Sequence, residues 1–201
     1  MDIPFSLKIS SPKNPRIKNT LRLRDRRGRM KQGRFLIDGI REIGRAAKSG
    51  IEIIELYICT PVNPSRKQQI AELLATIHRE KTELIEVDEH VFEKVAFGDR
   101  AEGLLAVART AEPSLDELLV PRCPLFGVLE RVEKPGNVGA VLRSADGAGL
   151  SGLIIADGET DLYNPNTVRS SLGTIFSMPV AAATSESTIA WLRRHDIHIF
   201  A

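Results

Sequence analysis

The stretch EKPGNVGAVLRSADGAGL, residues 133–150, lies between two apolar runs, LFGVLE at 125–130 and GLIIAD at 152–157. Its small and apolar residues recur at a helical spacing, and a Pro-Gly pair precedes them. We expect Asn137 to cap this helix and Gly149 to end it in the left-handed conformation. A helix between two continuous apolar strands is typical of a parallel sheet covered by helices.

The same alternation of strands and helices extends in both directions from this stretch. Upstream, strands are expected at 34–38, 51–59, 83–87 and 103–109, and helices at 14–32, 39–50, 64–80 and 88–97. Downstream, helices are expected at 167–172 and 186–195 and strands at 175–181 and 197–201. Between the two halves, the proline-rich residues 110–124 interrupt the pattern. We therefore predict an α/β domain at 1–110, a linker at 111–123 and a second α/β domain at 124–201.

Composition excludes several classes of protein. Only two cysteines are present, Cys59 and Cys123, so the spacing indicates neither a disulfide framework nor a zinc site. No apolar run approaches the roughly 20 residues of a membrane span, and the N-terminus lacks the apolar core of a signal peptide. We expect a cytoplasmic protein with no metal and no membrane partner.

Positive charge is concentrated near the N-terminus. Residues 13–45 contain twelve basic and three acidic residues, a net charge of +9 in a chain whose total is +2. Such asymmetry is typical of a surface that meets phosphates, although a solvated helix face is the simpler alternative. Arginine predominates, and its planar guanidinium suits phosphates and exposed bases. The candidate RNA contacts are Arg22, Arg24, Arg26, Arg27, Arg29 and Lys31.

Arg143 is unusual in a helix whose other residues suit packing against a sheet. One interpretation is a surface ion pair with a carboxylate, and the other is a functional role at the mouth above the sheet. The glycines of GNVGAV lack the third glycine of a dinucleotide-binding turn, so that alternative is weakly supported. His195 and His198 have no further metal ligands nearby in the sequence and are better explained as surface residues.

A second cluster, DLYNPNTVRSSLGTIFSMPV at 161–180, begins a helix at Asn164 and Pro165. Alone it indicates an ordinary helix with a polar end. Taken in order, NVGAVLRSADGAG and NPNTVRSSLGTIFSMPV resemble the first two signature motifs of the SpoU (TrmH-type) RNA 2′-O-ribose methyltransferases of the SPOUT superfamily. Upstream, residues 14–43 and 101–109 look like that family's substrate-binding domain of ribosomal-protein L30e type.

The resemblance implies an L30e-like α/β sandwich followed by a SPOUT α/β-knot domain with a mostly parallel sheet and a trefoil knot. It also implies S-adenosylmethionine (AdoMet) as cofactor, a homodimer with its active site at the subunit interface, and methylation of a ribose 2′-hydroxyl in ribosomal or transfer RNA. The matching positions make Asn137 and Arg143 catalytic, place Ser171, Gly173 and Ile175 at the cofactor, and place Arg169 on the RNA.

The chain departs from the family at its end, because the third motif, of the Ser-Leu-Asn-Val-Ser kind, is not present before Ala201. That motif ties the knot and supplies part of the cofactor pocket. We therefore expect the knot domain to be incomplete and AdoMet to bind poorly to these 201 residues. The alternative function is a noncatalytic RNA-binding protein with a decayed methyltransferase half.

Overall fold

The computed structural model of the protein describes residues 3–77, 80–97, 102–111 and 113–200. The chain divides into two compact units. The first comprises Met1–Thr110 together with Tyr163–Pro165, and the second comprises Ala111–Leu162 and Asn166–Ala201. No helix in the described ranges is long and apolar enough to cross a membrane.

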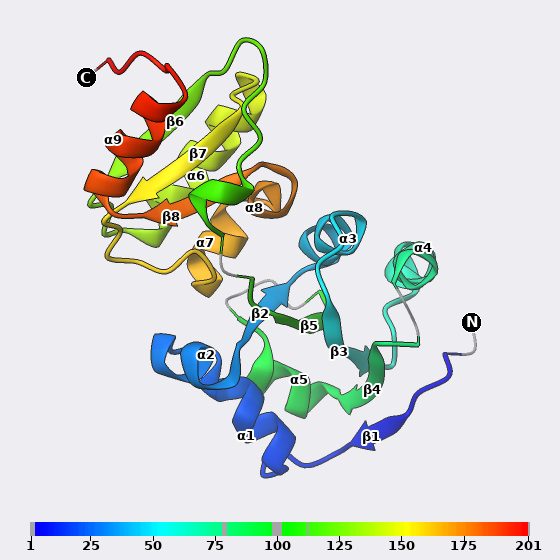
Figure 1. Ribbon diagram of the computed structural model, residues 1–201. Helices are drawn as coiled ribbons and strands as arrows, with labels where there is room; N and C mark the ends of the chain where they lie inside the picture. Colours follow the sequence, from blue (N-terminus) through cyan, green and yellow to red (C-terminus); the bar gives the residue numbers. More distant parts are fainter. Residues whose placement is uncertain (1–2, 78–79, 98–101, 112, 201) are drawn as a thin grey trace. The chain divides into compact units, whose positions relative to one another are not determined.

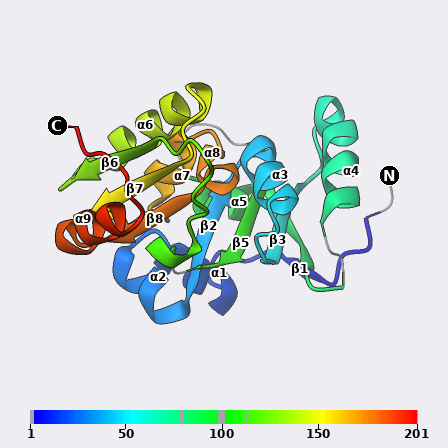
Figure 2. The ribbon, with the colours of Figure 1, turned by 45° about the horizontal axis from the view of Figure 1, so that its top comes forward.

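The first unit is a mixed five-stranded sheet with helices on both faces (Figure 1). Its elements are β1 Leu7–Ile9, α1 Pro15–Arg22, α2 Arg26–Gln32, β2 Arg34–Asp38, α3 Ile40–Lys48, β3 Ile53–Thr60, η1 Pro64–Arg66, α4 Lys67–Thr76, β4 Glu83–Asp88, α5 Glu89–Val95 and β5 Leu104–Arg109. The strand order is β1-β4-β3-β5-β2, with β1 and β3 parallel to β4 and with β5 antiparallel to both β3 and β2. Helices α3 and α4 cover one face, and α1 and α5 cover the other (Figures 1 and 2).

The core of this unit follows from the alternation of side chains along its strands. Leu36, Tyr57 and Ile85 point toward α1 and α5, where they form a buried cluster with Ile17 and Phe92. The preceding residues along the same strands, Phe35, Leu56 and Leu84, are buried as well, because α3 and α4 cover the opposite face. The predicted sandwich of helices and sheet is confirmed.

The predicted helix at 14–32 is two helices, because the chain turns at residues 23–25. Asn14 begins α1 as expected, since its Oδ1 accepts the Arg16 N–H at 2.9 Å. At the turn, Gly28 packs so closely on the end of α1 that a Cβ there would lie 1.8 Å from the Arg22 carbonyl oxygen. A single straight helix is therefore not formed, and α1 and α2 meet at a corner.

The second unit is a three-stranded parallel sheet of order β6-β7-β8. Its elements are η2 Leu115–Glu117, β6 Phe126–Glu130, α6 Pro135–Gly147, β7 Gly152–Ala156, α7 Pro165–Ser170, α8 Thr174–Ser177, β8 Val180–Ala183 and α9 Ser185–Arg194. Helix α9 packs on one face through Trp191 and Leu192, which contact Ile154 of β7. Helices α6 and α8 lie on the other face (Figure 1). The mostly parallel sheet expected from the sequence is confirmed in this unit.

The segment interpreted as a linker, 111–123, lies against the second unit where it is described. Leu118 is buried beside Trp191 and Ile154. The Ala182 N–H donates to the Pro113 carbonyl at 3.0 Å. These residues therefore belong structurally to the parallel sheet and its helices.

Three details of the sequence prediction for this unit are wrong. Asn137 is not the helix cap, because α6 begins at Pro135 with Lys134 as its N-cap; a proline at the first position has a helical φ and needs no N–H partner there. The strand expected at 175–181 starts only at Val180, because residues 174–177 form α8. Residues 197–200 form no strand, since they pair with no described strand, and Phe200 is 93% exposed.

Candidate functional site

The second unit brings the predicted catalytic arginine onto the turn predicted to hold the cofactor. Helix α6 starts just beyond the carboxyl end of β6, where parallel sheets commonly bind ligands. Arg143, in the third turn of this helix, is exposed, and its Nη1 donates to the carbonyl oxygen of Ser170. Ser170 is the last residue of α7 and directly precedes Ser171. Among the described residues Arg143 forms no ion pair, so the surface-carboxylate interpretation is not supported.

Helix α6 approaches this turn through a glycine. A Cβ on Gly139 would lie 1.9 Å from Ser170 Oγ and 2.6 Å from the Ser171 nitrogen. The glycine itself was a weak signal for this contact, since a glycine inside a helix is destabilising by about 1 kcal/mol relative to alanine and commonly has a packing reason. Gly139 and the Ser170 carbonyl are the parts of the site that the sequence prediction missed.

The turn itself is tightly hydrogen-bonded. Ser171 is fully buried, and its hydroxyl donates to the Val168 carbonyl at 2.7 Å and accepts the Gly173 N–H at 3.2 Å. Leu172 and Gly173 both have left-handed backbone conformations, with φ of 55° and 84°. Ile175 follows in α8 and is nearly buried. Of the three residues predicted at the cofactor, Ser171 and Gly173 therefore lie in one hydrogen-bonded turn after α7, and Ile175 follows directly in α8.

The other two predicted residues of this half lie elsewhere on the same elements. Asn137 is exposed, and its side chain has no hydrogen bond to another described residue. It is six residues before Arg143, so the two side chains point in different directions around α6. Arg169 is half-buried in the last turn of α7. Of the two predicted catalytic residues, Arg143 is thus the one that the structure places at the turn predicted to hold the cofactor.

In the first unit, the six candidate RNA contacts separate into exposed and structural residues. Arg22, Arg26, Arg27 and Lys31 are exposed; we call these four side chains the α1–α2 patch. Met30 lies among them in the sequence and is 74% exposed. An apolar side chain beside several cations is an arrangement suited to a nucleic acid, whose bases stack while its phosphates attract charge.

Arg29 and Arg24 do not belong to this patch. Arg29 is only 3% exposed, and its Nη1 donates to the carbonyls of Leu23 at 2.8 Å and Arg24 at 2.7 Å. These carbonyls lie just beyond the end of α1, where no further helical turn can bond them. Arg24 Nη2 donates to the carbonyls of Lys94 and Ala96, at 2.9 and 2.7 Å, at the end of α5. Both arginines stabilise the corner that the patch is built on.

A buried polar network anchors α1 to the sheet. The Tyr57 hydroxyl is fully buried, donates to Glu55 Oε2 at 2.7 Å and lies 3.0 Å from Thr20 Oγ1 on α1. Burial is the main cause that raises the pKa of this hydroxyl far above its ordinary value, and the nearby Glu55 carboxylate acts in the same direction. The α1–α2 patch therefore rests on a fixed support.

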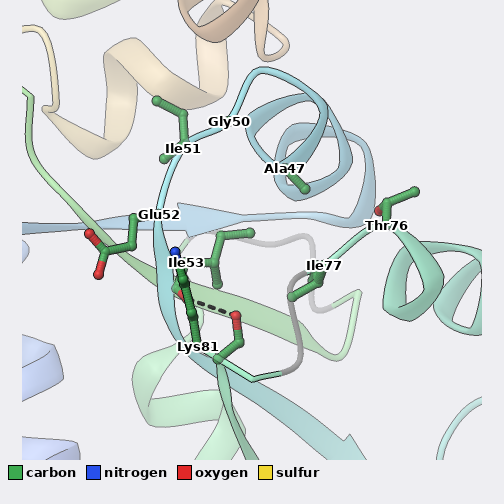
Figure 3. A pocket seen from close by; sticks show the side chains of 9 residues that line it. Ala47, Gly50, Ile51, Glu52, Ile53, Thr76, Ile77 and Lys81 are labelled. Carbon is green, nitrogen blue, oxygen red and sulfur yellow. Dashed lines mark hydrogen bonds between the residues drawn. The ribbon is translucent and has the colours of Figure 1, made fainter.

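Two pockets formed by described residues lie apart from Arg143 and the turn after α7. A pocket of about 350 Å³ in the first unit lies between the ends of α3 and α4, with Ala47, Ile51, Thr76 and Ile77 on its walls (Figure 3). Both threonine hydroxyls of its lining are hydrogen-bonded within the protein, since Thr82 Oγ1 donates to the Ile53 carbonyl at 2.7 Å and Thr76 Oγ1 donates to the Leu73 carbonyl at 2.7 Å. A larger pocket of about 730 Å³ lies between β6 and α9. No three His, Cys, Asp or Glu side chains of the described ranges gather as they would around a metal ion.

Comparison with known proteins identifies both halves. Residues 14–106 match the MRM3-like substrate binding domain, and residues 124–201 match the SpoU rRNA Methylase family. A 23S rRNA (uridine(2479)-2′-O)-methyltransferase of Streptomyces viridochromogenes is 33% identical over 83% of this chain and 57% of its own length. The chain thus spans little more than half of that curated relative.

Solved structures agree with these matches. The crystal structure of an RNA 2′-O ribose methyltransferase has a TM-score of 0.78 and 40% identity, and the match covers 94% of this chain and 70% of that one. The SpoU methyltransferase AviRb from Streptomyces viridochromogenes, in complex with the cofactor AdoMet, has a TM-score of 0.79 and 30% identity over 92% and 69% of the two chains. Both units of this chain are therefore covered by solved structures of the same fold.

Proposed function

Since the chain belongs to the SpoU family of RNA 2′-O-ribose methyltransferases, we propose that it takes part in methyl transfer from AdoMet to a ribose 2′-hydroxyl of ribosomal RNA. The observation that carries the proposal is the exposed Arg143 guanidinium bound to the turn after α7. The name of the Streptomyces viridochromogenes relative, a 23S rRNA methyltransferase, supports ribosomal rather than transfer RNA.

The cofactor would be held at the turn that contains Ser171 and Gly173, next to Ile175 of α8. The turn offers a glycine in the left-handed conformation beside an apolar side chain, which suits the close approach of a flat, partly apolar adenosine. The AdoMet-bound structure of the related AviRb supports the same cofactor. Bound AdoMet supplies an electrophilic methyl group.

Arg143 would stabilise the negative charge that develops on the ribose 2′-oxygen as it accepts the methyl group. A ribose hydroxyl is a poor nucleophile, and negative charge develops on its oxygen as it is methylated. A fixed guanidinium can hold the adjacent phosphate and stabilise the developing alkoxide. Arg143 does not act as an ordinary base, because a guanidinium hardly deprotonates in proteins. Asn137, exposed on the same helix, would orient the ribose by hydrogen bonds from its amide.

The α1–α2 patch would supply affinity for the RNA phosphates. The four exposed cations contribute a salt-dependent attraction that does not depend on base sequence. We assign Arg169, half-buried beside the cofactor turn, to the acceptor strand. A second copy of the protein would complete the active site, as the resemblance implies.

The test measures 2′-O-methylated nucleosides by mass spectrometry after nuclease digestion of ribosomal and transfer RNA incubated with protein and AdoMet. We expect one methylated ribose in ribosomal RNA and about a hundredfold slower transfer by Arg143→Ala, the scale for losing one preorganised charged donor. Tight RNA binding with no methylation in either RNA would favour the noncatalytic RNA-binding protein instead.

A further inference from the structure

Gly139 and Arg143 lie one helical turn apart on the same face of α6, and both meet Ser170. Gly139 faces the Ser170 side chain, and the Arg143 guanidinium bonds the Ser170 carbonyl. We propose that Gly139 is a positioning residue, whose missing side chain lets α6 lie directly on the turn after α7 and so fixes Arg143 against that turn.

The approach is closer than any side chain would permit. A Cβ on Gly139 would lie 1.9 Å from Ser170 Oγ, 2.6 Å from the Ser171 nitrogen and 2.8 Å from the Ser170 carbonyl carbon. Two of these three atoms belong to the main chain, so rotating the serine side chain would not relieve the clash. The turn would have to move away from α6.

Movement of the turn would separate groups that the site needs together. The Ser170 carbonyl would leave the Arg143 guanidinium, and Ser171 and Gly173 would move with it, because the Ser171 hydroxyl bonds the Gly173 N–H. One glycine therefore sets the spacing between the arginine and the cofactor turn. The catalytic meaning of this spacing rests on the proposed function, whereas the packing itself does not.

The requirements of helix formation do not explain why residue 139 is a glycine. Glycine is a poor helix former and alanine is the best one, and Gly139 has an ordinary helical position in the interior of α6. Two other glycines of the same helix serve as comparisons, since a Cβ on Gly136 or Gly147 would meet nothing within 4 Å. Gly147→Ala is the matched control, because it makes the same glycine-to-alanine change on α6, one turn beyond Arg143, at a position where a Cβ meets nothing.

The first measurement is amide hydrogen exchange by mass spectrometry, which needs neither cofactor nor RNA. In Gly139→Ala and in Arg143→Ala, exchange of a peptide covering 170–178 should accelerate by about tenfold or more, while Gly147→Ala should match the wild type. The double variant Gly139→Ala/Arg143→Ala should exchange no faster than Gly139→Ala alone, because both changes remove the same contact.

Wild-type exchange of this peptide in folded Gly139→Ala would overturn the inference, and so would additive effects in the double variant. If Gly139→Ala does not fold, Arg143→Ala decides the matter, since unchanged exchange there would show that the arginine does not hold the turn.

Calorimetric titration with AdoMet then separates this inference from the proposed function. We expect the Kd to rise about tenfold in Gly139→Ala and to stay at the wild-type value in Gly147→Ala. Faster exchange in Gly139→Ala together with a wild-type Kd for AdoMet would support the positioning role of Gly139 and would overturn the assignment of the cofactor to this turn.

Discussion

Replacing Arg29 should destabilise the first unit, although Arg29 lies among the most basic residues of the chain. The Arg29→Ala change removes two hydrogen bonds from a charged donor, to the carbonyls of Leu23 and Arg24, and leaves a buried space. Hydrogen bonds to charged groups contribute about 1.5–3 kcal/mol each, so the free energy of unfolding should fall by about 3 kcal/mol or more. For a domain of this size the Tm should decrease by about 12 °C or more.

Arg27→Ala is the matched control, because Arg27 is exposed to solvent and lies two residues before Arg29 on α2. Its Tm should stay within about 2 °C of the wild type, as is usual for surface changes. Its RNA affinity should instead depend less on salt, with the log–log slope smaller by about 0.7.

Differential scanning calorimetry measures both Tm values and can resolve the two units if they unfold separately. A salt titration of RNA binding gives the slopes. An Arg29→Ala protein with a wild-type Tm and a reduced salt dependence of RNA binding would refute the structural role of Arg29. Arg29 would then have to be assigned to the RNA-binding surface.

Three further predictions concern the patch, the site and the buried tyrosine. Arg22→Ala/Arg26→Ala/Arg27→Ala should reduce the salt slope of RNA binding by about 2 with little change in Tm; an unchanged slope would exclude the patch as the phosphate surface. Arg143→Lys should recover little of the methyl transfer lost in Arg143→Ala, because a single ammonium cannot reproduce the guanidinium fork, and single-turnover rates check this. Because the raised pKa of Tyr57 keeps its hydroxyl neutral in the folded protein, its contribution to stability is fully present below the ordinary tyrosine pKa of about 10 and is lost as the pH rises above it. Urea unfolding at rising pH should show this loss in the wild type and less of it in Tyr57→Phe.

The strands β2 to β7 were predictable from the sequence, because each one contains a short run of apolar residues, whereas β1 was missed and β8 starts later than expected. The corner between α1 and α2 was not, since it depends on Gly28 meeting the Arg22 carbonyl and on Arg29 bonding carbonyls that the turn exposes. The exposure of each arginine in that segment could not be predicted for the same reason. A straight helix would have turned a different set of side chains to the solvent.

In the second unit the motifs identified Arg143 and the turn after α7, but the pattern could not show how they meet. The contact depends on two segments, at 139–143 and 170–171, that are separated by β7, a loop and most of α7. Residues 174–177 are apolar enough to predict a strand, yet the left-handed Leu172 and Gly173 redirect the chain into α8. At these residues the geometry of the turn, and not the local propensity for a strand, determines the secondary structure.

The outer position of β6 affects how the protein must be handled. In the described part of the chain this strand pairs only with β7, so its other edge presents unpaired main-chain groups beside Leu125 and Val128, which are 59% and 43% exposed. Such an edge invites pairing with another molecule, and aggregation then increases with concentration. Purification at low protein concentration, or the substitution Val128→Lys, would reduce this aggregation. Without such a measure, aggregates could be mistaken for a specific oligomer in light scattering.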